Sequence, residues 1–233
     1  MNASALACLV NIFVDPAKAL TDAKAHTRWL WYPFVITLFV SVGFGVWYFL
    51  TVDLGWLVDQ IVSGMAGKMD ADQVDRVRDS MTRGRFLFGA VAGNLLGISA
   101  IYVLQAVYLL LVDKLGGSEI QSFGKWFSFT AWTYFPNVLA TVATAVMYLF
   151  SPGKQVSLYR IDVTSVNTLL FHLPKSSNWF SILQNLHLTL FWTLGLMIFG
   201  FALWTRKSLG KSALIVLAPY VVIYGVIVAI KLA

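Results

Sequence analysis

The chain has little charge, one cysteine and no run of basic residues, and each shortage narrows what it can be. Only 12% of its 233 residues are charged, against about 25% in a soluble domain. With 58% hydrophobic residues and a mean hydropathy of +0.74, the composition indicates an integral membrane protein. Cys8 alone forms neither an internal disulfide nor a cysteine-based metal site. A net charge of +6 without a basic run favours contact with lipid headgroups, and we expect no nucleic acid.

The chain also lacks the usual signs of catalysis. No H-x-x-x-H, C-x-x-C, G-x-S-x-G or phosphate-loop pattern occurs, and the histidines, His26, His172 and His187, are isolated from acids and from one another in the sequence. We therefore predict no enzyme, no cofactor and no metal site, and we interpret His187 as a satisfied histidine at the outer end of a span. No apolar stretch carries an acid or a base near its centre, which removes the proton relays and salt-bridged substrate sites of many transporters.

Five apolar stretches are each long enough to cross about 30 Å of hydrocarbon as a helix. Aromatic residues gather near their ends, as expected at headgroup level, and none alternates in the way of a barrel strand. The sequence therefore predicts an all-α membrane protein, in which residues 1–233 form one domain with a single bundle of five transmembrane helices. The expected spans are residues 30–52, 86–112, 126–150, 186–204 and 212–230.

Short helices are expected outside the spans. One apolar face near the N-terminus indicates an amphipathic helix at the membrane interface, formed by Leu6, Leu9, Val10 and Phe13. Asp15 and Pro16 then predict the start of a second short helix. In the first outer loop, Asp70 and Gln73 form a capping-box pattern ahead of a narrow apolar stripe, which predicts another amphipathic helix. This helix would lie on the membrane, remain solvated or dock a partner.

The second outer loop contains a weaker signal. Its partial alternation of apolar residues predicts one short strand or hairpin, formed by Val156, Leu158, Tyr159, Ile161 and Val163.

The flanking charges predict the orientation. Lysine and arginine are denser on the N-terminal side of the bundle, and the short loop "TRKSLGK" holds cations and no acid. We therefore expect the N-terminus in the cytoplasm and the C-terminus outside.

The second expected span carries two distinct faces. Gly89, Gly93 and Gly97 recur every four residues, a ridge that lets another helix approach closely, either within the bundle or from a partner. Asn94 and Gln105 fall on nearly one face, with Tyr108 beside them. An unpaired amide in lipid is costly, so this face points into protein or water. Hydrogen bonds between helices are the favoured interpretation, and a polar path is the alternative.

The third expected span contains a proline and an amide near its middle. Pro136 removes a backbone hydrogen bond and kinks the helix, freeing a carbonyl group that Thr133, Asn137 or a neighbouring helix can satisfy in the bundle interior. Such a kink shapes helix packing or serves transport, and packing is the favoured interpretation.

Three stretches resemble the Yip family, the Ypt/Rab-interacting membrane proteins, as it occurs in bacteria. They are "NIFVDPAKAL", "DKLGGSEIQSFGKWFSFTAWTYFPNVL" and "FSILQNLHLTLFWTLGLMIFGFALWTRKSLGKSALIVLAPYVVIYG". The resemblance implies five spans, a cytoplasmic N-terminus and, here, a bacterial inner membrane. Eukaryotic members act in vesicle traffic with small GTPases through a long N-terminal region, whereas this chain has only residues 1–29 there. Some bacterial relatives look associated with ABC-type exporters, which implies an accessory subunit.

Two functions follow from the sequence. The favoured one is a non-enzymatic adaptor or scaffold that binds other membrane proteins, an exporter or a second copy of itself. The alternative is a small transporter or lipid-handling protein that uses a polar path between spans two and three. The absence of charge inside the spans favours the adaptor.

Overall fold

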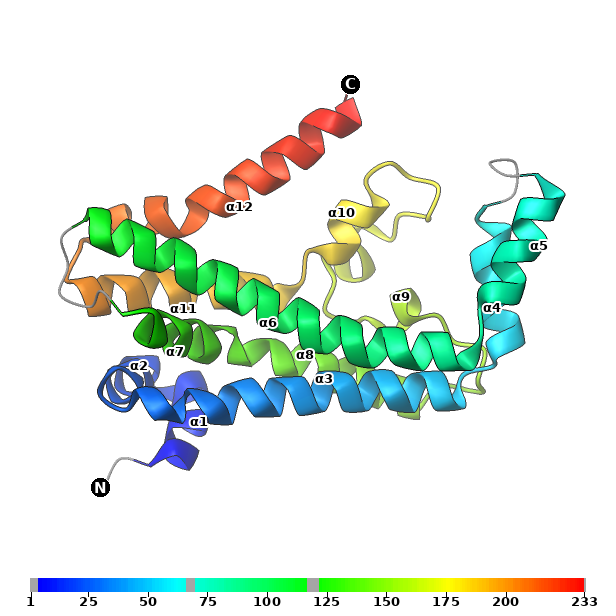
Figure 1. The fold of residues 1–233 in the computed structure, drawn as a ribbon. Coiled ribbons are helices and arrows are strands. Elements are labelled where there is room, and N and C mark those ends of the chain that lie inside the picture. Colours follow the sequence, from blue (N-terminus) through cyan, green and yellow to red (C-terminus); the bar gives the residue numbers. More distant parts are fainter. Residues whose placement is uncertain (1–3, 66–69, 117–121, 233) are drawn as a thin grey trace.

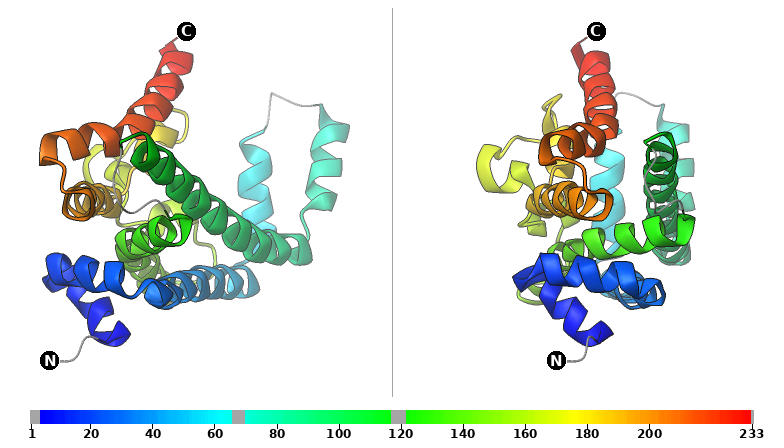
Figure 2. Two further views of the ribbon diagram at one scale, coloured as in Figure 1. Left: turned by 60° about the vertical axis from the view of Figure 1, so that its left-hand side comes forward. Right: turned by 90° about the vertical axis from the view of Figure 1, so that its left-hand side faces the viewer.

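A computed structural model describes residues 4–65, 70–116 and 122–232, and these residues form helices joined by short loops (Figure 1). Residues 66–69 and 117–121, in two of the loops, lie outside the described residues. Helix α3 (Trp31–Thr51) follows a 3-10 turn, η1 (Thr27–Leu30), and packs along α6 (Arg83–Leu115). The N- and C-termini lie at opposite sides of the molecule (Figure 2).

Among the described residues, four helices are long and apolar enough to cross a membrane. They are Thr27–Thr51, Arg83–Leu115, α11 (Leu188–Thr205) and α12 (Leu209–Leu232), which overlap four of the five expected spans. Helix α6 extends beyond both predicted ends. The chain is thus an integral membrane protein made of helices, and the count of five spans stays a prediction.

The remaining expected span is not one helix. Helix α7 (Phe123–Tyr134) and helix α8 (Val138–Leu149) are separated by a 3-10 turn, η2 (Phe135–Asn137), that contains Pro136. The Asn137 side-chain amide donates to Tyr134 O at 3.0 Å and to Thr193 Oγ1 of α11 at 3.1 Å. A side chain at the break therefore satisfies a backbone carbonyl and ties the break to a neighbouring helix.

The core lies at the end of the bundle that holds the N-terminal helices, α1 (Ala5–Val14) and α2 (Pro16–Ala25). Trp126, Phe129 and Phe201 are fully buried there, in contact with α2. Trp204 donates its indole N–H to Leu20 O at 2.9 Å, which fixes α2 against α11. Helix α2 begins with Asp15 accepting from Lys18 N and with Pro16 in its first turn.

The face of α1 expected at the membrane interface is divided. Leu6 and Val10 are exposed, whereas Leu9 and Phe13 pack against the core. The fully buried residues of α1 are instead Cys8 and Ile12. They are not part of the i, i+3, i+4 pattern of apolar side chains from which the face was predicted.

Two helices, α4 (Leu54–Ser63) and α5 (Ala71–Ser80), lie in the loop between α3 and α6, the first loop predicted to be outer. They stand away from the bundle in Figure 2. Helix α5 begins with the capping box of Asp70 and Gln73, and Arg78 pairs with Asp59 of α4 at 2.5 Å. Helix α4 was not predicted from the sequence, although Asp53 caps it by accepting a hydrogen bond from Trp56 N at 3.1 Å.

The expectation of a strand in the loop between α8 and α11, the second loop predicted to be outer, was wrong. Leu158–Ile161 form one helical turn, α9, followed by a π-helical turn, η3 (Asn167–Phe171), and by α10 (Phe180–Asn185). Within the described residues the only β-bridge joins Ser165 and His187. Ile161 is buried against Tyr48 and Tyr148, so its burial depends on aromatic side chains of α3 and α8 and needs no sheet.

Candidate functional site

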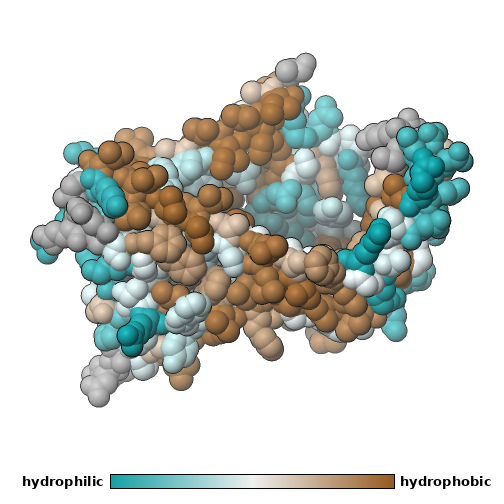
Figure 3. All heavy atoms as spheres, viewed as in Figure 1, coloured by the Kyte–Doolittle hydropathy of each residue, from teal (hydrophilic) through white to brown (hydrophobic). Residues whose placement is uncertain are grey.

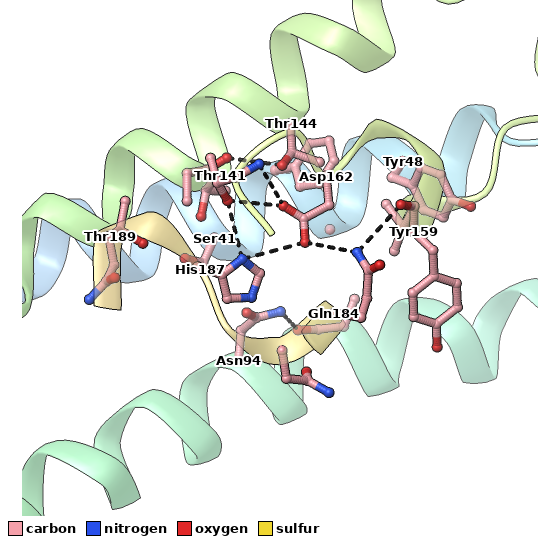
Figure 4. Close-up of a pocket in the computed structure, with 18 of the residues that line it drawn as sticks. Ser41, Tyr48, Asn94, Thr141, Thr144, Tyr159, Asp162, Gln184, His187 and Thr189 are labelled. Atoms are coloured by element: carbon pink, nitrogen blue, oxygen red, sulfur yellow. Dashed lines mark hydrogen bonds and ion pairs between the residues drawn. The ribbon is translucent and has the colours of Figure 1, made fainter. Parts of the chain in front are cut away.

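A polar cavity of about 490 Å³ lies between the bundle and the loop that joins α8 to α11. Helices α3, α6 and α8 form its walls, and residues 158–187 supply its remaining side (Figure 4). Figure 3 shows a hollow beyond α6 with hydrophilic residues inside it; apolar residues border it along α6 and α12, and hydrophilic residues border it at α5. Its lining residues are Ser41, Phe44, Gly45, Tyr48, Phe49, Ala90, Asn94, Asn137, Ala140, Thr141, Thr144, Leu158, Tyr159, Asp162, Thr164, Gln184, Asn185, His187 and Thr189.

The β-bridge between Ser165 and His187 brings Asp162 and His187 together in the site. Val166 N donates to Leu186 O at 2.7 Å, and Leu188 N donates to Thr164 O at 2.9 Å. This pairing holds the loop after α9 against the start of α11. As a result, Asp162 Oδ2 lies 3.5 Å from His187 Nδ1, although the two residues are far apart in the sequence.

The Asp162 carboxylate is held mainly through one oxygen. Its Oδ1 accepts from Thr164 N at 3.2 Å and from Thr164 Oγ1 at 3.0 Å, a local turn typical of aspartate. Burial raises the pKa of Asp162, but His187 and the Thr164 donors lower it by more, so the pKa lies below its ordinary value of 3.8. The carboxylate is therefore ionised at neutral pH.

A second layer of amides supports the carboxylate. Gln184 Nε2 lies 3.5 Å from Asp162 Oδ2, and Gln184 Oε1 accepts from Asn167 Nδ2 at 3.2 Å. Asn167 Oδ1 in turn accepts from Leu173 N at 2.9 Å. Both amide side chains are buried, so they fix the loop and the side of the cavity that Asp162 occupies.

The wall opposite the loop is less polar. Phe44 and Phe49 of α3 and Ala90 of α6 line it, and Gly45 allows the two helices to approach closely. A Cβ atom added at Gly45 would lie 3.2 Å from Ala90 Cβ. The membrane helices thus supply an apolar patch at Phe44, Phe49 and Ala90 beside hydroxyl and amide groups, and the loop that joins α8 to α11 supplies the carboxylate of Asp162.

The structure separates the residues expected to form a polar path. Asn94 lines the cavity and donates to Ala90 O at 2.7 Å, while Asn137 lines it from the break in the third stretch. Gln105 and Tyr108 do not line it. Tyr108 donates to Ile215 O of α12 at 2.6 Å. Gln105 is buried, and its Nε2 has no hydrogen-bond partner among the described residues.

The glycine ridge does not pack inside the bundle. An added Cβ at Gly89, Gly93 or Gly97 would meet no described atom within 4 Å. The expectation of a close helix contact there within the chain was wrong, because α3 approaches α6 at Ala90, where Gly45 leaves room. The ridge is an exposed strip that also includes Leu96 and Leu104.

Metal ligation is not supported by this arrangement. Among residues 4–65, 70–116 and 122–232, no three side chains of the usual metal-ligating types lie together. The site instead offers a carboxylate, amides and hydroxyl groups to a ligand that forms hydrogen bonds.

Asp162 was not predicted from the sequence as a site residue. His187 has hydrogen-bonding neighbours, as expected, but its acid comes from a different loop that is distant in the sequence. A signal was present, since "RIDVTS" contains the Asp-x-Thr spacing of a side-chain turn. Nothing in that spacing, however, predicts contact with His187.

Comparisons with known proteins give one match. Residues 10–230 match the family model described as the Yip1 domain. No curated protein and no solved structure matches the chain significantly.

Proposed function

The chain belongs to the Yip1 domain family, and we propose that it is a lipid-handling membrane protein that binds one amphipathic molecule in the polar cavity. The observation that carries the proposal is the cavity itself, with Asp162 and His187 in its polar wall. The main argument for the adaptor was that no span carries a charged residue near its centre. The loop that contains Asp162 brings a charge into the cavity, which weakens that argument. The proposal assigns no chemical reaction to the chain.

The size and lining of the cavity support an amphiphile. Small-molecule sites commonly measure about 300–1,000 Å³, and this one is about 490 Å³. A polar headgroup fits the side formed by Asp162, Gln184 and His187. Acyl carbon atoms fit the side formed by Phe44 and Phe49, because burying apolar area there releases water.

The test is whether the purified chain retains a lipid. Native mass spectrometry after mild detergent extraction should find one amphiphile bound to the wild type. Thr141→Phe fills the cavity from α8 and should abolish retention. Val142→Phe changes the next residue on the same helix, which is exposed and does not line the cavity, and should leave retention intact. Equal retention by both variants would refute the proposal.

We propose that the N-terminus lies in the cytoplasm of a bacterial cell and the C-terminus outside. In that orientation the cavity opens at the outer half of the inner membrane. The cation-rich loop "TRKSLGK" supports it.

A second candidate function is the adaptor, and the exposed glycine strip of α6 favours it. Gly89, Gly93 and Gly97 leave room for a partner helix. Only 6% of the apolar window of α12 is buried, so that helix also offers surface to another membrane protein. An ABC-type exporter and a second copy of the chain are the candidate partners.

Site-specific photocrosslinking tests this second function. A photoreactive residue at Leu96, beside the strip, should capture a membrane protein, whereas one at the equally exposed Phe39 of α3 should capture only lipid. Gly93→Ile should abolish capture from Leu96. Capture of lipid alone from both positions would exclude a partner on this face, and mass spectrometry of a captured protein would identify an exporter subunit.

A further inference from the structure

We infer that the ligand carries an ammonium group at its polar end and that this group binds Asp162 Oδ2. The inference rests on the proposed amphiphile-binding function and names the chemical class of the headgroup. Its basis is the charge of the cavity, the contacts of the carboxylate and the acceptors around it.

The charge of the cavity has one sign. Among the lining residues that the structure describes, Asp162 is the only acid, and none is a lysine or an arginine. A phosphate or carboxylate headgroup placed beside Asp162 would meet a like charge without a permanent cation to offset it. The cavity therefore selects against anionic groups at this end.

The two carboxylate oxygens differ in how well they are paired. Oδ1 accepts two hydrogen bonds from Thr164, at 3.0 and 3.2 Å. Among the described residues, Oδ2 has only Gln184 Nε2 and His187 Nδ1, both at 3.5 Å, the outer limit for a hydrogen bond. An ionised oxygen normally accepts at about 2.7–2.9 Å, so Oδ2 still has room for a short donor.

The burial of Asp162 strengthens its attraction for a cation. Its side chain is only 18% exposed, so water screens the carboxylate weakly, and a cation at Oδ2 interacts with it more strongly than it would at the surface. His187 is not committed to it, since His187 Nδ1 lies closer to Thr164 Oγ1, at 3.2 Å. An ammonium group donates a charge-assisted hydrogen bond to Oδ2 and neutralises the site.

The surrounding groups suit the other N–H bonds of an ammonium. Thr141, Thr144 and Asn94 line the same cavity (Figure 4) and carry oxygen atoms that accept hydrogen bonds. A neutral polyol headgroup would also use these oxygens, but it would leave the charge of Asp162 uncompensated. That difference separates the two ligand classes by experiment.

The first arm of the test uses the purified full-length chain in a nonionic maltoside detergent. Octylammonium and octanol have the same alkyl chain and differ in the head. Octylammonium should bind at least about tenfold more tightly, as expected for a charge-assisted contact, with affinity measured from ligand-dependent thermal stabilisation. Equal affinity for the two probes would overturn the inference, and this comparison needs no variant.

The second arm removes the charge and keeps the shape. Asp162→Asn should lose the preference for octylammonium while still binding octanol. The matched control is Asp59→Asn, which neutralises an exposed acid on α4 that does not line the cavity, and the preference should remain. An undiminished preference in Asp162→Asn would also overturn the inference.

The third arm identifies the source of the ammonium group. The chain is placed in nanodiscs of phosphatidylglycerol mixed with phosphatidylethanolamine, and its retained lipids are counted by native mass spectrometry. Enrichment of the ethanolamine lipid indicates a bilayer lipid. Octylammonium selectivity without this enrichment indicates a soluble amine, which equally supports the inference. Retention of lipid without any preference for ammonium refutes the inference alone, whereas no retention and no probe binding refute the proposed function as well.

Discussion

A methyl group at Gly200 should destabilise the protein, and the structure gives the size of the effect. A Cβ atom added at Gly200 of α11 would lie 2.8 Å from Leu20 Cδ1 and 2.8 Å from Phe129 Cε2. Both neighbours are fully buried in the core, so neither has open space to move into. Overpacking of this kind costs about 1–3 kcal/mol.

Gly195 is the control, because it lies on the same helix and an added Cβ would meet nothing within 4 Å. Replacing glycine by alanine inside a helix gains roughly 0.5–1 kcal/mol through backbone entropy, and this gain is common to both variants. The difference between Gly200→Ala and Gly195→Ala therefore isolates the packing cost. At about 2–4 °C per kcal/mol for a chain of this length, Gly200→Ala should melt about 2–12 °C below Gly195→Ala.

The assay is thermal unfolding of the two purified variants in the same detergent, followed by tryptophan fluorescence or by loss of monodisperse protein. Equal melting temperatures would show that α2 and α7 do not contact α11 at Gly200. The docking of the N-terminal helices in the core would then be wrong.

Further predictions follow from other positions. Gly93→Ile should leave the thermal stability of the isolated chain unchanged within about 0.5 kcal/mol, because nothing lies within 4 Å of an added Cβ; a large loss in detergent would mean that a helix covers the strip. Cys8 should resist maleimide until the protein unfolds, since its thiol is buried, donates to Ala19 O and has a pKa raised to about 12; labelling of the native chain would contradict this. The lowered pKa of Asp162 gives stability that is complete above its unfolded value of 3.8 and lost as pH falls through the folded value; the melting temperatures of the wild type and Asp162→Asn should therefore converge below about pH 4. A reporter cysteine in "TRKSLGK" should be shielded from an impermeant reagent in intact cells and one in "DADQVDRVRDS" should react, and the reverse pattern would invert the topology.

The sequence predicted the membrane helices well because their signal is local. A long apolar run specifies a helix wherever it packs, so residues 30–52 and 86–112 were found within a few positions. Pro136 was also informative, since a proline breaks the backbone ladder in any context. The capping box at Asp70 is local in the same way.

The site was harder to predict because it depends on contacts between distant segments. Asp162 and His187 meet only through the bridge at Ser165, and no period or spacing encodes that pairing. The glycine ridge shows the opposite error. Its spacing is correct for close packing, but the helix that approaches α6 does so at Ala90, where Gly45 of α3 leaves room.

The most direct test of the proposed function is an experimental density map of the chain in a lipid nanodisc. The account predicts elongated non-protein density in the cavity between α3, α6 and α8. Its polar end should lie within hydrogen-bond reach of Asp162 Oδ2, and its tail should run along Phe44 and Phe49. A cavity that contains only water, or that protein side chains fill, would contradict the account.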